Sequence, residues 1–262
     1  MVKIKTYNID DIKYKRIYGN NFITTISKEC ELAFYYKNEG YNDDEIAKNY
    51  FISGYRTFNR ISEILVSLNL KLDNIKSFLD FASGFGRTTR FFVQKLNPNR
   101  ITISDINKEA VNFQIKIFGV KGFISDKDPD NIDCKGKYQV IIVNSLFSHL
   151  NHNYWLRMLK KLFELLEPKG YLIFSTNGSY LFRKRNENFR RLLKLKSPEK
   201  DFYFISGNNT MKLDHNYYGC TFVTKSFVQK TIKNNQLGKL VQSYNPLYRF
   251  MGDQDVYVIH KV

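Results

Sequence analysis

Residues 76–87, with the sequence KSFLDFASGFGR, constrain the fold of this chain more than any other stretch. Residues 78–81 predict a short buried strand, and residues 87–96 predict a helix whose apolar side chains recur at helical spacing. Gly84 and Gly86 lie between them, and because glycine lacks a Cβ, such a turn bends sharply and lets a ligand lie against the backbone. A strand, a glycine turn and a helix start together are typical of sites for nucleotide-like cofactors, with a plain strand-to-helix turn as the alternative.

A second strand predicted at residues 100–105 ends on an acid, Asp105, and a helix at residues 107–118 follows it. An acid in this position of a Rossmann-like unit accepts hydrogen bonds from ribose hydroxyls. Thr89 stands where the third glycine of a G-x-G-x-x-G motif is expected. The sequence therefore favours a nucleoside cofactor without phosphates over a dinucleotide.

With these motifs the chain resembles the class I S-adenosylmethionine-dependent methyltransferases, on the strength of Asp80, Ser83, Gly84, Gly86 and Asp105. The resemblance begins at Ser77 and continues to the C-terminus. It implies an α/β fold with a Rossmann-like, seven-stranded, mostly parallel sheet, a terminal antiparallel strand and helices on both faces. It also implies S-adenosylmethionine as the cofactor, bound by Asp80, Ala82, Ser83, Gly84, Gly86, Asp105, Ile106, Asp126, Asn144 and Ser145.

The rest of the chain alternates strands and helices, as in a doubly wound parallel sheet. We expect strands at residues 121–125, 138–144 and 171–175, helices at residues 154–166 and 225–234, and a closing antiparallel pair at residues 239–244 and 256–260. Residues 177–221, after the fifth strand, are longer than a normal connection, so we interpret them as an insertion that covers the substrate.

The first 75 residues are expected to form a largely helical extension beside the cofactor cleft, and residues 76–262 the methyltransferase domain. Asn42 or Asp43 can cap a helix, which Gly54 is expected to interrupt before a second helix continues to residue 68. Residues 21–26 are compatible with a strand and residues 29–36 with a helix. Tyr50, Tyr55 and Arg56 can then reach the cofactor or the substrate, or simply pack in the core.

Histidine is the natural general base for methylation of an oxygen atom, because it titrates near neutral pH. His149 follows the fourth predicted strand, and His215 lies in the insertion; both are candidate catalytic residues, with a structural role as the alternative for each. His152 is expected to face solvent near the start of a helix, and His260 to have a structural role in the last strand. Since the acids and histidines lack metal-ligand spacing, no catalytic metal is expected.

The net charge of +16 raises the question of an anionic partner. A nucleic acid is one possibility, but the alternative of lysines spread over the whole surface is preferred. The densest basic run is residues 183–200. The sequence lacks an apolar run long enough to span a membrane and a signal-peptide core, and its three cysteines are widely spaced. These features predict a cytoplasmic protein.

The sequence thus predicts methyl transfer from S-adenosylmethionine to a small molecule, with an oxygen of a saccharide or related metabolite as the favoured acceptor. The segment SLFSHL at residues 145–150 resembles bacterial enzymes of this kind, and it lacks the Asn/Asp-Pro-Pro-aromatic motif of enzymes that methylate base amino groups. An RNA or protein methyltransferase and a non-catalytic cofactor-binding scaffold are the alternatives. A nicotinamide-dependent oxidoreductase is a more distant one, and the oligomeric state is not indicated.

Overall fold

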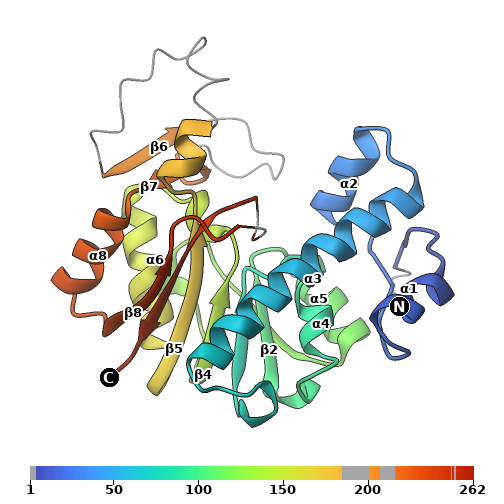
Figure 1. The fold of residues 1–262 in the computed structure, drawn as a ribbon, viewed down its shortest axis with the longest axis horizontal. Helices are drawn as coiled ribbons and strands as arrows, with labels where there is room; N and C mark the ends of the chain where they lie inside the picture. Colours follow the sequence, from blue (N-terminus) through green and yellow to red (C-terminus); the bar gives the residue numbers. More distant parts are fainter. Residues whose placement is uncertain (1–3, 185–200, 207–215, 249, 251) are drawn as a thin grey trace. The chain divides into compact units, whose positions relative to one another are not determined.

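A computed structural model describes residues 4–184, 201–206, 216–248, 250 and 252–262 of the chain (Figure 1). Within these residues the helices and strands follow one another in the order α1 (Asp11–Tyr18), α2 (Glu31–Asn38), α3 (Asp43–Ser67), β1 (Phe78–Phe81), α4 (Thr89–Phe92), β2 (Ile101–Asp105), α5 (Lys108–Phe118), β3 (Lys121–Ile124), β4 (Tyr138–Val143), α6 (His152–Glu164), β5 (Leu166–Thr176), β6 (Phe202–Ser206), β7 (Gly219–Val223), α8 (Lys225–Asn234), β8 (Lys239–Tyr244) and β9 (Asp255–His260). The alternation of strands and helices from β1 to β5 is the pattern that the sequence predicts.

The described strands form a seven-stranded sheet in the order β3-β2-β1-β4-β5-β9-β8 and a separate two-stranded sheet of β6 and β7. In the larger sheet β1, β2 and β3 pair in parallel, as do β4 and β5. β9, the last strand of the chain, runs antiparallel to both β5 and β8. This confirms the predicted Rossmann-like sheet, mostly parallel with one antiparallel strand.

The chain divides into two compact units, residues 1–125 and residues 126–262. In the first unit the register places Asp80 of β1 opposite Ile103 of β2, and Asp105 of β2 opposite Ile124 of β3. Parallel strands present their carboxyl ends at one edge of a sheet, which is where ligands bind in such folds. The glycine turn after β1 and Asp105 at the end of β2 therefore share that edge.

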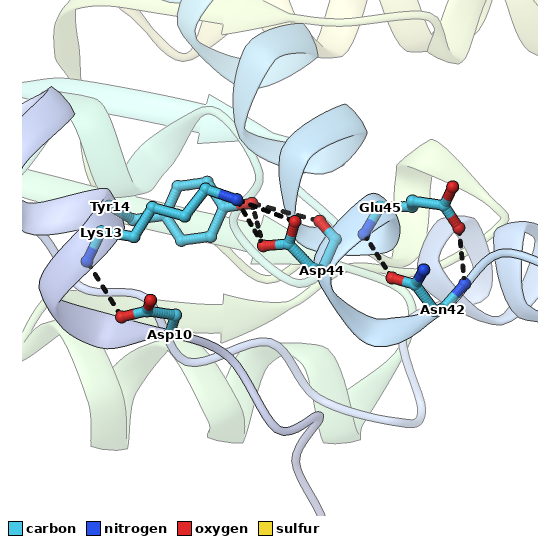
Figure 2. Close-up of polar contacts among 6 residues, drawn as sticks. All are labelled: Asp10, Lys13, Tyr14, Asn42, Asp44 and Glu45. Atoms are coloured by element: carbon cyan, nitrogen blue, oxygen red, sulfur yellow. Dashed lines mark hydrogen bonds and ion pairs between the residues drawn. The ribbon is translucent and has the colours of Figure 1, made fainter.

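The described part of the N-terminal extension is largely helical. α2 overlaps the helix considered at residues 29–36, and α3 begins after Asn42 as expected, but two features differ from the prediction. α3 is one continuous helix of 25 residues. Asn42 caps it with a reciprocal pair of hydrogen bonds to Glu45, each about 3 Å long (Figure 2). The predicted break at Gly54 is wrong: a Cβ there would overlap the backbone carbonyl oxygen of Arg87. The glycine lets α3 pack closely against the segment that follows the cofactor turn.

Helix α1 was not anticipated, because its eight residues carry no strong apolar periodicity. Its place is set by partners distant in sequence: Lys13 Nζ lies 2.8 Å from the Asp44 carboxylate, and the Tyr14 hydroxyl donates to the same residue (Figure 2). Residues 21–26 do not form the strand considered above; Ser27 makes an isolated bridge with Thr6. Tertiary contacts, not local propensity, decide this region.

Two other boundaries differ from the prediction. α4 is shorter than expected, because beyond it the amides of Gln94 and Lys95 bond to carbonyls three residues back, which tightens the backbone out of α-helical geometry. β5 begins at Leu166, where the sequence predicts a helix end and a stop. The register between β4 and β5 shifts after Leu166 and resumes at Tyr171, so residues 167–170 are not part of that pairing.

In the second unit the predicted insertion contains β6 and the first three residues of β7, and the two strands pair antiparallel from Phe202↔Val223 to Ser206↔Gly219. α8 and β8 have the predicted bounds. Most of the basic run at residues 183–200 lies outside the described residues. Within the described part of the chain, no helix is long and apolar enough to cross a membrane.

Candidate functional site

The turn after β1 is built from three residues in left-handed backbone conformations: Ala82 at φ 57°, Gly84 at φ 55° and Gly86 at φ 73°. Glycine adopts such angles at little cost, whereas for alanine the left-handed region costs about 1–2 kcal/mol. Strain of this kind concentrates at functional sites, where surrounding contacts hold it in place. Ala82 therefore marks this turn as more than a connection between a strand and a helix.

The two glycines of the turn meet different surroundings. A Cβ at Gly84 would meet nothing within 4 Å, so the backbone there borders open space. A Cβ at Gly86 would overlap Phe118 and Gln114 of α5. Gln114 is fully buried, and its side-chain amide donates to Ser83 Oγ at 2.7 Å and to the Gly84 carbonyl at 2.8 Å. Gln114 thus shapes the turn, a role its place in an amphipathic helix does not indicate.

Asp80, at the carboxyl end of β1, is buried with one oxygen satisfied and one not. Its Oδ2 accepts a hydrogen bond from the Thr89 hydroxyl at 2.7 Å, so the residue in place of the third glycine has a defined partner. Its Oδ1 is buried and has no hydrogen-bond partner within the described structure. Burial raises the pKa of Asp80 to about 7, with Thr89 and Arg87 opposing the rise and Asp105 adding to it.

Asp105 lies at the end of β2 and is tied to the glycine turn. Its Oδ2 accepts from the backbone N–H of Gly84 at 2.7 Å, and its Oδ1 accepts from the backbone N–H of Asn107 at 2.9 Å. Burial raises the pKa of Asp105, and these two N–H groups oppose the rise. Ile106, next to it, is 38% exposed. The predicted residues of the first two strands are therefore brought together at one edge of the sheet.

The open space beside Gly84, the unsatisfied oxygen of Asp80 and the carboxylate of Asp105 suit a ligand that carries several hydrogen-bond donors. A buried acceptor without a partner costs about 1–3 kcal/mol, which a bound donor relieves. A nucleoside joined to an amino acid offers such donors in its ribose hydroxyls and its amine. The hydrogen-bond acceptors of the first unit thus fit the cofactor that the resemblance implies.

The N-terminal extension supports this turn through buried side chains. Tyr50 is fully buried and its hydroxyl donates to the Phe85 carbonyl at 3.4 Å, so it packs in the core beside the turn. The buried guanidinium of Arg90 donates to the carbonyls of Ile23 (2.8 Å) and Thr25 (3.2 Å) and lies over the rings of aromatic residues. Sequence analysis missed Arg90, because its partners are more than 60 residues away.

The remaining predicted site residues belong to the second unit. Asn144 follows β4, and Ser145 has a left-handed backbone with φ 65°. The Ser145 amide donates to Ser175 Oγ at 2.9 Å, and its hydroxyl donates to Gln254 Oε1 at 3.0 Å. Gln254 is buried and also bonds to Asn177. It lies in the loop before β9, where nothing in the sequence signals a partner for the loop after β4.

His149 is held in a defined orientation in the same loop. Its Nδ1 lies 2.9 Å from the carbonyl oxygen of Gly219, and its ring stacks on Tyr218 with the centroids 4.6 Å apart and the planes 9° from parallel. A carbonyl oxygen only accepts hydrogen bonds, so in the neutral ring Nδ1 carries the proton and Nε2 holds the lone pair. The insertion therefore supplies two contacts that orient this histidine.

The other candidates contribute less. Asp126 Oδ1 accepts from the backbone N–H of Asp128 at 2.7 Å. Asp128 and Asp130 form ion pairs with Arg157, so these two acids of the loop have a cationic partner. His215 lies outside the described residues. In the described part of the chain, no cluster of three or more histidine, cysteine, aspartate or glutamate side chains is arranged to hold a metal ion.

Comparison with known families assigns residues 54–229 to the family described as "Methyltransferase domain". Among curated proteins, malonyl-[acyl-carrier protein] O-methyltransferase of Calditerrivibrio nitroreducens is 30% identical over 100 residues. That match spans 38% of this chain and 38% of the relative's length. The family match includes the glycine turn, Asp105, the loop of His149 and the insertion.

Solved structures share the fold at low sequence identity. Magnesium protoporphyrin IX methyltransferase of Synechocystis PCC 6803 has a TM-score of 0.58 and 16% identity, over 90% of this chain and 97% of that one. The 1,6-didemethyltoxoflavin-N1-methyltransferase of Burkholderia thailandensis has a TM-score of 0.54 and 15% identity, over 79% and 78% of the two chains. Both structures contain bound S-adenosylhomocysteine.

Proposed function

This chain belongs to the class I S-adenosylmethionine-dependent methyltransferases, and we propose that it methylates an oxygen atom of a small molecule, with a saccharide or related metabolite as the favoured acceptor. The observation that carries the proposal is the orientation of His149, whose Nδ1 faces the Gly219 carbonyl. An oxygen acceptor is more nucleophilic once its proton is removed, and a histidine with an unprotonated Nε2 is suited to that task.

Asp80, Gly84 and Asp105 are the residues proposed to hold the cofactor in the first unit, with Ala82, Ser83, Gly86 and Ile106 shaping the same turn. When bound, S-adenosylmethionine supplies a methyl group already activated by the sulfonium, so the protein has mainly to align the acceptor and manage its proton. Asp105 accepts hydrogen bonds from the ribose, and the unsatisfied oxygen of Asp80 accepts from a further donor. Asp126, Asn144 and Ser145, all of the second unit, are proposed as further cofactor-binding residues on the strength of the resemblance alone.

Replacing Asp105 with alanine is expected to weaken binding of S-adenosylhomocysteine by about 1–3 kcal/mol, because hydrogen bonds to a charged acceptor are lost. Calorimetric titration of the folded variant measures the change. Asp133→Ala, which removes an exposed acid far along the chain, is the matched control and should bind like the wild type. Unchanged affinity in a folded Asp105→Ala variant would remove the ribose assignment.

His149 is proposed to take the proton from the acceptor hydroxyl at Nε2, while the Gly219 carbonyl keeps the proton on Nδ1 and Tyr218 fixes the plane of the ring. His215 is kept as a second candidate base from the sequence alone. The name of the curated relative, an O-methyltransferase, supports an oxygen acceptor. All three cysteines are free thiols, which supports a reducing compartment such as the cytoplasm.

An RNA or protein methyltransferase is the second candidate, and the net charge of +16 is the observation that favours it. The test begins with calorimetric titration of the purified chain with S-adenosylhomocysteine and, as a control ligand, NAD. Micromolar binding of the first and none of the second is expected. Methyl transfer is then compared between sugars, nucleotide sugars, RNA and protein. Binding of NAD alone, or transfer only to RNA or protein, would overturn the proposal.

A further inference from the structure

A carboxylate of the N-terminal extension lies close to Asp105 at the glycine turn. Glu31 is the first residue of α2, and its Oε1 lies 3.1 Å from Nδ2 of Asn107. Asn107 in turn donates its backbone N–H to Asp105 Oδ1 at 2.9 Å. Glu31, Asn107 and Asp105 thus form a connected series, although Glu31 is 76 residues from Asn107 in the sequence.

The direction of the hydrogen bond between Asn107 and Glu31 follows from the other contacts of the Asn107 side chain. Asn107 caps α5, and its Oδ1 accepts from the backbone N–H groups of Glu109 (2.9 Å) and Ala110 (3.1 Å). Because the oxygen of the amide is occupied by the helix cap, the NH₂ group faces Glu31. Glu31 is therefore the acceptor of this bond, and its second carboxylate oxygen is not required for it.

Glu31 and Asp105 carry like charges close together. Glu31 is one of the groups that raise the pKa of Asp105, after the larger effect of burial. No ion pair within the described residues involves either of them. Two neighbouring carboxylates without a cation are unfavourable by themselves, whereas a ligand with adjacent O–H donors stabilises both. A ribose diol has that chemistry.

Helix α2 is also fixed beside the turn independently of Glu31. The thiol of Cys30, which precedes the helix, lies 3.8 Å from the Tyr50 hydroxyl, and that hydroxyl donates to the carbonyl of Phe85. Further along α2, Arg87 is close enough to Tyr36 to oppose the rise that burial causes in the pKa of that tyrosine. The start of the helix is thus connected to the turn through Cys30 and Tyr50, and Arg87, just after the turn, lies near its last turn.

We infer that Glu31 is a specificity-determining residue for the cofactor, sharing with Asp105 the recognition of the two ribose hydroxyls. The inference rests on the proposed cofactor, and it assigns a binding role to Glu31, a residue of the N-terminal extension that precedes the family match at residues 54–229. Asn107 holds the Glu31 carboxylate in place while the rest of that carboxylate accepts from the ligand.

The test measures calorimetric affinities of wild type, Glu31→Gln and Glu31→Ala for S-adenosylhomocysteine and its 2′-deoxy and 3′-deoxy ribose analogues. Glu39→Gln, at the exposed end of the same helix, is the matched control. Loss of a hydrogen bond to a charged acceptor predicts that both Glu31 variants bind S-adenosylhomocysteine about tenfold more weakly than the wild type. The control variant should bind it with wild-type affinity. With the analogue that lacks the hydroxyl bound by Glu31, wild type and variants should bind equally.

The outcomes separate the inference from its premise. Equal affinity of the Glu31 variants and the wild type for S-adenosylhomocysteine would overturn the inference alone. A loss of the same factor for all three ligands would also overturn it, because a merely structural role does not distinguish ribose hydroxyls. A wild-type chain that binds none of the ligands would overturn the cofactor assignment and the inference with it.

Discussion

Replacing His149 with glutamine is expected to lower kcat by about 100–10,000-fold, the usual contribution of a general base. Glutamine is similar in size and can still donate to the Gly219 carbonyl, so the packing against Tyr218 is largely kept while the basic nitrogen is lost. The measurement is methyl transfer to the acceptor that the screen identifies. Binding of S-adenosylhomocysteine should be unchanged, which separates loss of the base from loss of the fold.

His152 provides the matched control for this prediction. It lies three residues further on, is exposed, and packs edge-on against Phe202 and Phe227. His152→Gln should therefore keep kcat within a few-fold of the wild type. If both variants are equally active, His149 is not the base; if both are equally impaired, the loss reflects the structure of this loop.

The pH profile and the tautomer of His149 give two further readouts. The acid limb of kcat/KM, where the base takes up a proton, should disappear in His149→Gln and persist in His152→Gln. Nitrogen-15 resonances of the neutral wild-type imidazole should show a protonated Nδ1 and an unprotonated Nε2, because the Gly219 carbonyl can only accept. The opposite tautomer would contradict the assignment without any assay of activity.

The sequence was sufficient where local pattern and fold agree. Four apolar-rich residues before a glycine turn predicted β1 with its observed bounds, and Lys225–Asn234 and Lys239–Tyr244 were likewise predicted as helix and strand. The acids at the ends of the first two strands follow from the parallel topology, which aligns strand ends at one edge. Asp80 and Asp105 were therefore predictable as neighbours of the same turn.

What the sequence did not predict depends on contacts between distant residues. Gly54 was expected to interrupt a helix on propensity, but the carbonyl of Arg87 leaves no room for a side chain there. Glu31 and Arg90 have polar partners 65 or more residues away, so no periodicity identifies them. The partners of His149 come from the insertion, where a glycine carbonyl and a tyrosine ring carry no recognisable motif.

Replacing Asp80 with asparagine is expected to change how the free energy of unfolding depends on pH. Burial raises the pKa of this carboxyl to about 7 in the folded chain, against a usual value near 4. Between these two values the unfolded chain has lost the proton and the folded chain still holds it. The contribution of Asp80 to stability is therefore complete below about pH 4, falls as the pH rises to about 7, and is constant above that.

The size of this fall is at most roughly 4 kcal/mol, since each pKa unit corresponds to about 1.4 kcal/mol. Asparagine has the same shape and does not ionise, so the variant should lack the fall. The difference in unfolding free energy between variant and wild type, measured by urea denaturation from pH 4 to 8, should grow in favour of the variant. Asp73→Asn, which changes an exposed acid of the same unit, should show no such growth.

The same variant separates stability from binding. Above pH 7 the wild-type chain holds a buried carboxylate whose Oδ1 has no partner within the described structure. Asparagine removes the buried charge, and with it the negative charge proposed to attract a donor of the cofactor. Asp80→Asn should therefore be more stable than the wild type at pH 8 and bind S-adenosylhomocysteine more weakly. If the variant is more stable but binds S-adenosylhomocysteine as well as the wild type does, Asp80 serves the fold alone. A residue that is retained for function at the expense of stability should show both greater stability and weaker binding when it is replaced.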